Sequence, residues 1–341
     1  MKKTPFISIC ILSYNRPETL ARLLKTIDTK NIDYVEIVIC EDASPKRLDI
    51  RQVVNYFSAQ KNFLVHYFEN EHNLGYDGTF NELCKHAQGK WLVFMGDDDE
   101  FAPLAFDKMF EFLQHHPELG YVMKSHYLLH ESRQKEVFRY FKGTKFFPSG
   151  LDTYAMLFRR SVFIAGFTIR REFVLPFITD RFDGTMLMQL YLLAEVVLKY
   201  PSAYFDEPFT QQYASHAHNA EDVMFDRDKK RFIPRRPTLD ISLKFLKSFS
   251  DITQYIDEKY HLDSTKRIKH DMSKYFYPSL SIHREAGLFF FIGYVRQLNK
   301  LGFNISFYYY IYVVLLACFG RNFCDRGIYW LKRMLGYTPQ L

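Results

Sequence analysis

Residues 89–103, which read GKWLVFMGDDDEFAP, decide the fold of this chain. Residues 91–95 form an apolar run with the length of a buried strand. The acidic triplet Asp97, Asp98 and Asp99 follows this run, and Pro103 then opens a helical pattern. A buried strand, an acidic turn and a helix in this order are typical of α/β proteins.

The same alternation extends over the first 130 residues. Strands are expected at 6–12, 34–40, 62–68, 91–95 and 119–125, with helical patterns between them. This order predicts a largely parallel, doubly wound sheet. From about residue 140 the rhythm changes: 151–158 and 185–198 have helical patterns, 204–206 and 209–213 are extended, and the chain is mostly helical from 239.

Polar residues follow three of the expected strands. Ser13 and Tyr14 follow the first strand, Asp42 follows the second, and the acidic triplet 97–99 follows the fourth. Doubly wound sheets bind ligands at the carboxyl ends of their strands. These residues are therefore expected to converge on one ligand-binding edge.

The first strand-to-helix turn, residues 13–17 (SYNRP), contains no glycine, so it is not a dinucleotide turn of the GxGxxG type. No Walker A sequence is present either. Carboxylates cannot bind phosphate directly, but they can hold Mg²⁺ or Mn²⁺, which bridge carboxylate and phosphate oxygens. An acidic triplet alone also fits a solvated turn before a helix, and its position beside Asp42 favours the metal site.

The composition is that of an ordinary globular protein, with 341 residues, 48% hydrophobic residues and a net charge of +6. This charge is too mild to indicate nucleic-acid binding. The five cysteines show no metal-ligand spacing and no disulfide framework, which favours a reducing compartment. The N-terminus lacks a cleavable-signal pattern, so a cytoplasmic location is expected.

Four segments carry a resemblance to a known family. Residues 7–16 (ISICILSYNR), 36–44 (EIVICEDAS), 73–81 (NLGYDGTFN) and 89–103 resemble the family 2 glycosyltransferases of the GT-A fold. The form NLGYD…GDDD is similar to abequosyltransferase-like members of bacterial O-antigen and capsule pathways. The resemblance is close over residues 5–130 and loose over 160–220.

The resemblance implies a GT-A fold, α/β with a Rossmann-like, doubly wound and mostly parallel sheet, and a helical C-terminal extension. Residues 1–225 would form the glycosyltransferase domain, with a nucleotide-sugar-binding half at 1–130 and an acceptor and base half at 131–225. Residues 226–341 would form a mainly helical region that either contacts a membrane or packs as core.

The resemblance also implies site residues. The nucleotide-sugar would be bound by Ser13, Tyr14, Arg16, Asp42, Asp97 and Asp98. Mn²⁺ or Mg²⁺ would be held directly by Asp99, with Asp97 as a helper and His216 or His218 nearby. The alternatives are that Tyr14 is a turn aromatic, that Asp42 caps a following segment, and that the histidines are solvated.

The chain departs from the family pattern in two places. Thr79-Phe80-Asn81 stands where many relatives have Ala-Arg-Asn, so the arginine that approaches the diphosphate is absent. Arg170 or Arg171 is the expected replacement. Gly96 stands where some relatives carry a further Asp.

The acceptor hydroxyl must lose a proton, and a carboxylate base would assist that step. The matching segment is 179–187 (TDRFDGTML), in which Asp183 is the expected base and Asp180 its rival. The alternative is that one of them only caps the following helix. Inversion at the anomeric carbon is implied by the resemblance.

The resulting expectation is an inverting, metal-dependent glycosyltransferase that moves a sugar from a nucleotide-diphosphate sugar to a glycan or lipid-linked glycan, with no nucleic acid as partner. The alternatives are a nucleotidyltransferase, disfavoured by the turn at 13–17, a non-catalytic nucleotide-sugar or glycan-binding scaffold, and an enzyme acting on a polyprenyl phosphate. Residues 307–319 (FYYYIYVVLLACF) are short for a membrane span, but they suit peripheral contact with the cytoplasmic face of the inner membrane. Sugar, nucleotide, acceptor and oligomeric state stay open.

Overall fold

The computed structural model describes residues 4–129, 135–213 and 239–335. The chain divides into two compact units. The first comprises Met1–Tyr154 and Ser161–Pro234, and the second comprises Ala155–Arg160 and Arg235–Leu341. The expected domain boundary at 225/226 lies outside the described residues.

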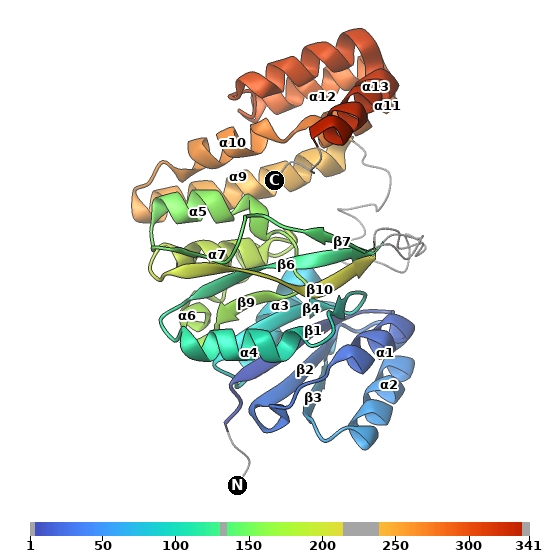
Figure 1. Cartoon of the computed structure of the whole chain (residues 1–341), viewed down its shortest axis with the longest axis vertical. Coiled ribbons are helices and arrows are strands. Elements are labelled where there is room, and N and C mark those ends of the chain that lie inside the picture. Colours follow the sequence, from blue (N-terminus) through green and yellow to red (C-terminus); the bar gives the residue numbers. More distant parts are fainter. Residues whose placement is uncertain (1–3, 130–134, 214–238, 336–341) are drawn as a thin grey trace. The chain divides into compact units, whose positions relative to one another are not determined.

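The first unit is built on one sheet, in which the strands lie in the order β3-β2-β1-β4-β9-β6-β10-β5 (Figure 1). Strands β1 to β4 are mutually parallel where they pair, and β6 is parallel to β10. The mostly parallel sheet expected from the sequence is thereby confirmed. The strands are β1 (Ile7–Ser13), β2 (Val35–Glu41), β3 (Leu64–Glu69), β4 (Trp91–Gly96), β5 (Glu100–Phe101), β6 (Tyr121–Leu129), β7 (Lys135–Phe138), β8 (Lys145–Phe147), β9 (Phe167–Arg170) and β10 (Ser202–Tyr213).

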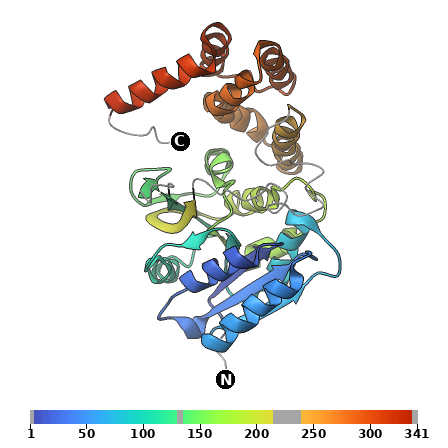
Figure 2. The same ribbon diagram turned by 90° about the vertical axis from the view of Figure 1, so that its right-hand side faces the viewer.

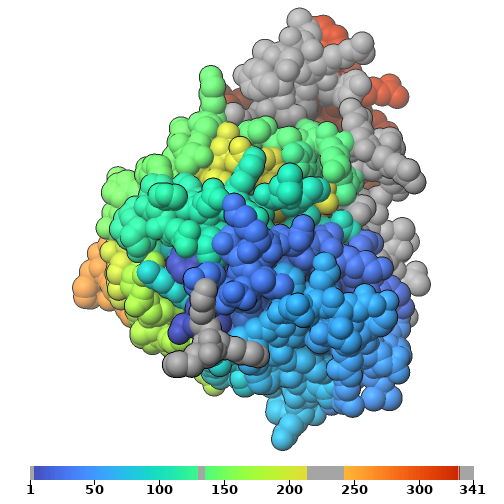
Figure 3. Space-filling view, turned by 60° about the horizontal axis from the view of Figure 1, so that its bottom comes forward, coloured from blue at the N-terminus to red at the C-terminus, as the bar shows by residue number. Residues whose placement is uncertain are grey.

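Helices cover both faces of this sheet, as the strand patterns require. Alternate residues of β1, such as Ile9, enter one apolar core together with residues of α1 (Pro17–Thr26), α2 (Arg47–Gln60) and α4 (Ala105–His115). The alternating residue Cys10 faces the other side, near Cys84 of α3 (Gly75–His86). Figure 2 shows α1 and α2 over the blue strands, and Figure 3 shows the blue surface of this part of the unit. Because both faces are covered, β1 and β2 are buried along their whole length.

The second half of the sheet differs from the sequence expectation. Strand β9 was not expected, and it runs antiparallel between β4 and β6. The two extended pieces expected at 204–206 and 209–213 are one strand, β10, whose register shifts on both sides of Pro208. A proline cannot donate to the ladder, so an irregularity at this position is physically expected. The remaining elements are η1 (Ile32–Tyr34), α5 (Leu151–Leu157), η2 (Arg159–Ser161), α6 (Arg171–Val174), η3 (Leu175–Phe177) and α7 (Met188–Val197).

The second unit is helical, as expected from residue 239 onward. Its helices are α9 (Leu239–Tyr260), α10 (Ser264–Lys274), α11 (Tyr277–Glu285), α12 (Leu288–Lys300) and α13 (Phe307–Leu335). Within α13, Phe307–Ile328 is long and apolar enough to cross a membrane by length and composition, and it is the one such helix among the described residues. Gly320 interrupts α13 with a non-helical backbone conformation.

Candidate functional site

The carboxyl ends of three strands lie at the same level of the sheet. In the β1–β2 ladder Ser13 is paired with Glu41, and in the β1–β4 ladder Leu12 is paired with Gly96. The residues that follow these strands therefore lie at one edge. The convergence of Tyr14, Asp42 and the acidic triplet that the sequence predicted is present in the structure.

The turn after β1 is fixed by the acidic triplet. The backbone N–H of Tyr14 donates to Asp97 Oδ2 at 3.0 Å. The guanidinium of Arg16 forms an ion pair with Asp97 and donates through Nη1 to Asp98 Oδ2 at 2.7 Å. Asn15 between them has a positive φ of 59°, a conformation that asparagine tolerates better than most residues. Arg16, expected to bind the nucleotide-sugar, is thus held by two carboxylates of its own chain.

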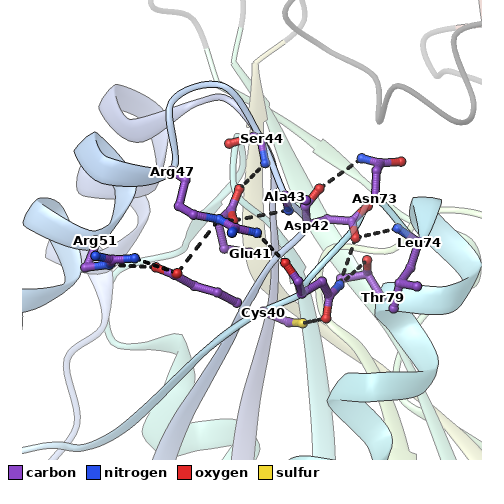
Figure 4. Close-up of polar contacts among 12 residues, drawn as sticks. Cys40, Glu41, Asp42, Ala43, Ser44, Arg47, Arg51, Asn73, Leu74 and Thr79 are labelled. Carbon is purple, nitrogen blue, oxygen red and sulfur yellow. Dashed lines mark hydrogen bonds and ion pairs between the residues drawn. The ribbon is translucent and has the colours of Figure 1, made fainter.

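Asp42 is a hub between β2 and α3 (Figure 4). Its Oδ1 accepts hydrogen bonds from Asn70 Nδ2 at 2.8 Å and from the backbone N–H of Leu74 at 2.7 Å. Its Oδ2 accepts from the backbone N–H of Gly75 at 2.9 Å, at the start of α3. Burial raises the pKa of Asp42, although these donors act in the opposite direction. The carboxylate therefore caps α3 and is fully buried among these donors.

The turn after β2 is held just as firmly. Glu41 accepts from the backbone N–H groups of Ala43, at 3.1 Å, and Ser44, at 2.6 Å, and from Nε of Arg47, at 2.6 Å. Ala43 has a positive φ of 55°. Alanine adopts this conformation only at a cost of roughly 1 kcal/mol, so the surrounding bonds are what hold Asp42 in place.

Two members of the acidic triplet, Asp97 and Asp99, are buried at this edge. Burial raises the pKa of Asp97 to about 7, although Arg16 beside it acts in the opposite direction. Burial and the neighbouring charge of Asp98 raise the pKa of Asp99 well above its usual range. Among the described residues, no hydrogen bond or ion pair reaches the Asp99 carboxylate, whose residue is only 6% exposed. A Cβ on Gly96 would lie 2.8 Å from Asp98 Oδ1, so glycine leaves the room that these carboxylates occupy.

Lys124 of β6 is a buried cation near this cluster that the sequence reasoning missed. Its Nζ donates to Thr210 Oγ1 at 2.9 Å and lies 4.2 Å from the centre of the Phe163 ring. Burial lowers the pKa of Lys124 to about 7, and the charge of Asp99 acts in the opposite direction. Gly166 gives the lysine room, because a Cβ there would lie 2.8 Å from its Cε. The signal in the sequence was a lysine inside an apolar strand, since a lysine is rarely buried without a partner.

The segment expected to carry the base is a turn before α7. Asp183 is half-buried and its N–H donates to the carbonyl of Asp180 at 3.0 Å, while Asp180 is exposed. Neither of them caps α7. The cap comes from Asp77 of α3, whose carboxylate accepts from the N–H groups of Met186 at 2.8 Å and Met188 at 2.9 Å. The alternative that one of these two aspartates serves only as the helix cap is therefore wrong.

Asp77 is thus a second residue that the sequence reasoning missed. It is 1% exposed and joins α3, which begins beside Asp42, to the turn that carries Asp183. Asn81, one turn further along α3, donates to the carbonyl of Thr179 at 2.9 Å. Helix α3 therefore positions both ends of the candidate site. Its sequence signal was an aspartate in the first turn of a helix, which alone indicates no distant partner.

The expectation that Arg170 or Arg171 approaches the diphosphate is wrong. Strand β9 runs antiparallel to β4, so Arg170 pairs with Trp91 at the amino end of β4, away from the acidic triplet. The guanidinium of Arg170 forms an ion pair with Glu172 at 2.8 Å and donates to the carbonyl of Pro117. His216 and His218 lie outside the described residues. In the described part of the chain, no group of three or more His, Cys, Asp or Glu side chains is arranged to hold a metal.

Part of the chain matches a known protein family. Residues 8–172 match the family model described as Glycosyl transferase family 2. This segment belongs to glycosyltransferase family 2. The family expected from the sequence is thereby confirmed, and the segment includes the residues after β1, β2 and β4.

Two curated relatives of this segment are named as sugar transferases, and one of these names includes colanic acid biosynthesis. The abequosyltransferase RfbV of Salmonella typhimurium is 31% identical over 96 residues, which are 28% of this chain and 29% of that protein. The putative colanic acid biosynthesis glycosyl transferase WcaA of Escherichia coli is 29% identical over 119 residues, 35% of this chain and 40% of that protein. The chain spans less than half the length of these relatives.

A solved structure shares the fold over most of the chain. The crystal structure of S. aureus TarS 1-349 in complex with UDP has a TM-score of 0.54 and 12% identity, covering 94% of this chain and 91% of that one. At this identity the likeness shows the fold alone. It confirms the fold class expected from the sequence, a GT-A fold with a helical C-terminal extension.

The two hydrogen bonds that Asp77 accepts from the turn 186–188 allow a test of how this turn is positioned. The Asp77→Ala variant is expected to lose roughly 2–4 kcal/mol of unfolding free energy, because two N–H groups lose a charged, buried acceptor. Urea unfolding followed by circular dichroism measures this loss. The matched control Asp180→Ala removes an exposed aspartate from the same turn and should stay within about 0.5 kcal/mol. Equal unfolding midpoints for the two variants would show that Asp77 does not anchor the turn.

Proposed function

We propose that the protein is an inverting, metal-dependent glycosyltransferase that moves a sugar from a nucleotide-diphosphate sugar to a glycan in bacterial surface polysaccharide biosynthesis. The single observation that carries the proposal is one edge of a family 2 sheet where Asp42 and three adjacent aspartates lie together. The names of the relatives RfbV and WcaA support a pathway of the O-antigen, capsule or exopolysaccharide kind.

The nucleotide part of the donor is assigned to the turns after β1 and β2. Ser13 and Tyr14 lie beside the site, and Asp42 offers carboxylate oxygens to base N–H or ribose hydroxyl groups. Because these turns are held by buried hydrogen bonds, they are preorganised for a ligand and need little rearrangement. Arg16, Asp97 and Asp98 act as one unit, in which the arginine keeps two carboxylates in place and in charge balance.

The buried carboxylates fit a divalent cation. Asp99 is buried beside Asp98, and no described residue donates to it, so the site has negative charge that a cation would balance. Asp99 is the proposed direct ligand of Mn²⁺ or Mg²⁺, with Asp97 as helper and His216 as a further proposed ligand. Such ions commonly use one or two carboxylates together with substrate phosphates. When bound, the ion supplies Lewis-acid stabilisation for the diphosphate leaving group.

Asp183 is the proposed base for the acceptor hydroxyl, with Asp180 second. Asp183 is half-buried in a turn anchored to α3, whereas Asp180 is exposed. A base needs a fixed position within hydrogen-bond reach of the proton that it removes, which favours the anchored residue. The carboxylate takes the proton from the acceptor hydroxyl as that oxygen bonds to the anomeric carbon and the nucleoside diphosphate departs.

The surrounding assignments complete the proposal. Residues 1–225 form the glycosyltransferase domain, with donor and acceptor halves divided near residue 130, and residues 226–341 form the helical extension. The acceptor is a glycan or lipid-linked glycan, and the protein works in the cytoplasm, at the cytoplasmic face of the inner membrane. A basic, aromatic C-terminal region suits such a peripheral location.

A thermal-shift panel tests the donor assignment. UDP-, GDP-, dTDP- and CDP-sugars are compared with and without Mn²⁺, each at about 100 times its dissociation constant or at the solubility limit. A ligand that binds the folded state stabilises it by mass action. At a concentration of about 100 times the dissociation constant the stabilisation is about 2.7 kcal/mol, which corresponds to a rise in melting temperature of about 5 °C. One nucleotide class is expected to give this rise only with Mn²⁺. No rise with any of the four classes would contradict the proposed function.

Replacing the proposed base separates an enzyme from a scaffold. Asp183→Asn is expected to lower kcat for sugar transfer by roughly 10²–10⁴-fold, because the acceptor proton loses its carboxylate. Donor binding in the thermal-shift assay should stay as in the unaltered protein. Asp180→Asn is the matched control and should keep most of the transfer rate. An unchanged rate of sugar transfer in Asp183→Asn would reject Asp183 as the base. A large loss of rate in Asp180→Asn alone would identify Asp180 as the base instead.

A further inference from the structure

One face of α13 is apolar and exposed. The opposite face packs within the second unit through buried residues such as Tyr309 and Leu316. Only 11% of the most apolar 18-residue window in α13 is buried. The exposed face, called here the α13 stripe, consists of Phe307, Val314, Leu315, Phe319, Phe323 and Trp330. Soluble surfaces rarely gather so many large apolar side chains, so the stripe indicates a binding surface.

The stripe is interrupted in its backbone but continuous in its side chains. Gly320 has φ 72° and ψ 173°, so the helix stops after Phe319 and begins again. The rings of Phe319 and Phe323 nevertheless stack across this break, with centroids 5.2 Å apart. Both parts of α13 therefore present apolar rings to the same side.

Side chains of the same unit stabilise the break. Arg284 of α11 donates through Nε to the carbonyl of Leu316 at 2.9 Å, one turn before the break. Arg321, directly after the break, forms ion pairs with Glu285 and Asp325. The interruption is thus part of the folded structure and has its own hydrogen bonds.

The break at Gly320 limits the length of uninterrupted apolar helix, and this length determines whether α13 can cross a membrane or only lie on it. The uninterrupted part, residues 307–319, has 13 residues and a length of about 20 Å at 1.5 Å per residue. The hydrocarbon core of a bilayer is about 30 Å thick. This part is therefore too short to cross the core, and Arg321, directly after the break, is charged and paired.

Charge identifies the kind of surface that the stripe fits. Residues 275–341 contain seven Lys or Arg and two Asp or Glu, a net charge of +5, whereas the whole chain has +6. Arg326 is exposed on the stripe itself, between Phe323 and Trp330. Aromatic rings and arginine together suit the headgroup level of a bilayer, and the excess positive charge suits anionic lipid.

We propose that α13 lies in the interface of an anionic bilayer, parallel to its surface, with the α13 stripe inserted between headgroups and acyl chains. The proposal deepens the membrane contact included in the proposed function and makes it specific to one helix face. The partner of the α13 stripe is a lipid surface, and the helix lies on this surface without crossing it. The proposal stands on contacts within the second unit, so it can be tested without sugar transfer.

A vesicle sedimentation experiment with the full chain tests the proposal. The vesicles contain either phosphatidylcholine alone or phosphatidylcholine with about a third of phosphatidylglycerol, a fraction chosen to give a clear negative surface charge. The unaltered protein is expected to sediment with the anionic vesicles at least about tenfold more strongly than with neutral ones, and high salt should weaken this binding. Alkaline carbonate should release it, because α13 is proposed to lie on the bilayer without crossing it.

Variants locate the binding surface. The double variant Phe319→Ser with Phe323→Ser should bind anionic vesicles at least about tenfold more weakly, with an unchanged melting temperature, because both side chains are more than half exposed. Tyr56→Ser, which removes an equally exposed ring from α2 in the first unit, is the matched control and should bind as the unaltered protein does.

Several outcomes would overturn the proposal. They are absence of binding to anionic vesicles, retention after carbonate treatment, and equal binding by the double variant. Lipid-free dimerisation in light scattering that the double variant abolishes would assign the stripe to a second copy of the chain instead. A nucleotide-dependent thermal shift measured on the same preparations keeps a failure of lipid binding distinct from a failure of the proposed function.

Discussion

The candidate site depends on holding three adjacent carboxylates at one edge of a sheet against their mutual repulsion. Asp97 is fully buried, and two contacts stabilise it there, the N–H of Tyr14 and the guanidinium of Arg16. The same contacts fix the turn after β1, so the acidic residues and the turn beside them cannot be positioned independently. Removing one partner of such a buried pair leaves an uncompensated charge, which costs several kcal/mol.

The charge balance explains how the three aspartates differ. Arg16 engages Asp97 and Asp98, while Lys124 lies on the side of Asp99 but is bonded to Thr210. Asp99 is therefore the carboxylate whose charge the described residues compensate least, and burial together with the charge of Asp98 raises its pKa. A cation bound there would relieve an electrostatic cost that the fold already carries.

The sequence predicted the first half of the molecule because local patterns govern it. Apolar runs that end in polar turns gave β1, β2 and β4, and parallel pairing then brought Tyr14, Asp42 and the triplet to one edge. Strand β9 was missed because it is short and pairs antiparallel between strands from other parts of the chain. That omission also produced the wrong assignment of Arg170 and Arg171. Their place at the amino end of β4 follows only from the direction of β9.

Long-range contacts account for the other residues that the sequence did not reveal. Asp77 caps a helix that begins more than a hundred residues later, and nothing in its own neighbourhood indicates this. Lys124 gives a sequence signal, but its nearness to Asp99 depends on how β6 is placed in the sheet. The break in α13 depends on Gly320, which sequence reading alone would have accepted within an apolar helix.

The most direct test of the central claim is Mn²⁺ binding by the Asp99→Asn variant. Electron paramagnetic resonance follows the loss of the free Mn²⁺ signal on titration with protein, in the presence of UDP, GDP, dTDP or CDP. The account predicts nucleotide-dependent Mn²⁺ binding by the unaltered protein and a loss of at least about tenfold in Asp99→Asn. The melting temperature of Asp99→Asn should not fall, because the substitution removes a buried, poorly compensated charge. Equal Mn²⁺ affinity in both proteins would contradict the assignment of Asp99 and, with it, the account of why this edge of the sheet is acidic.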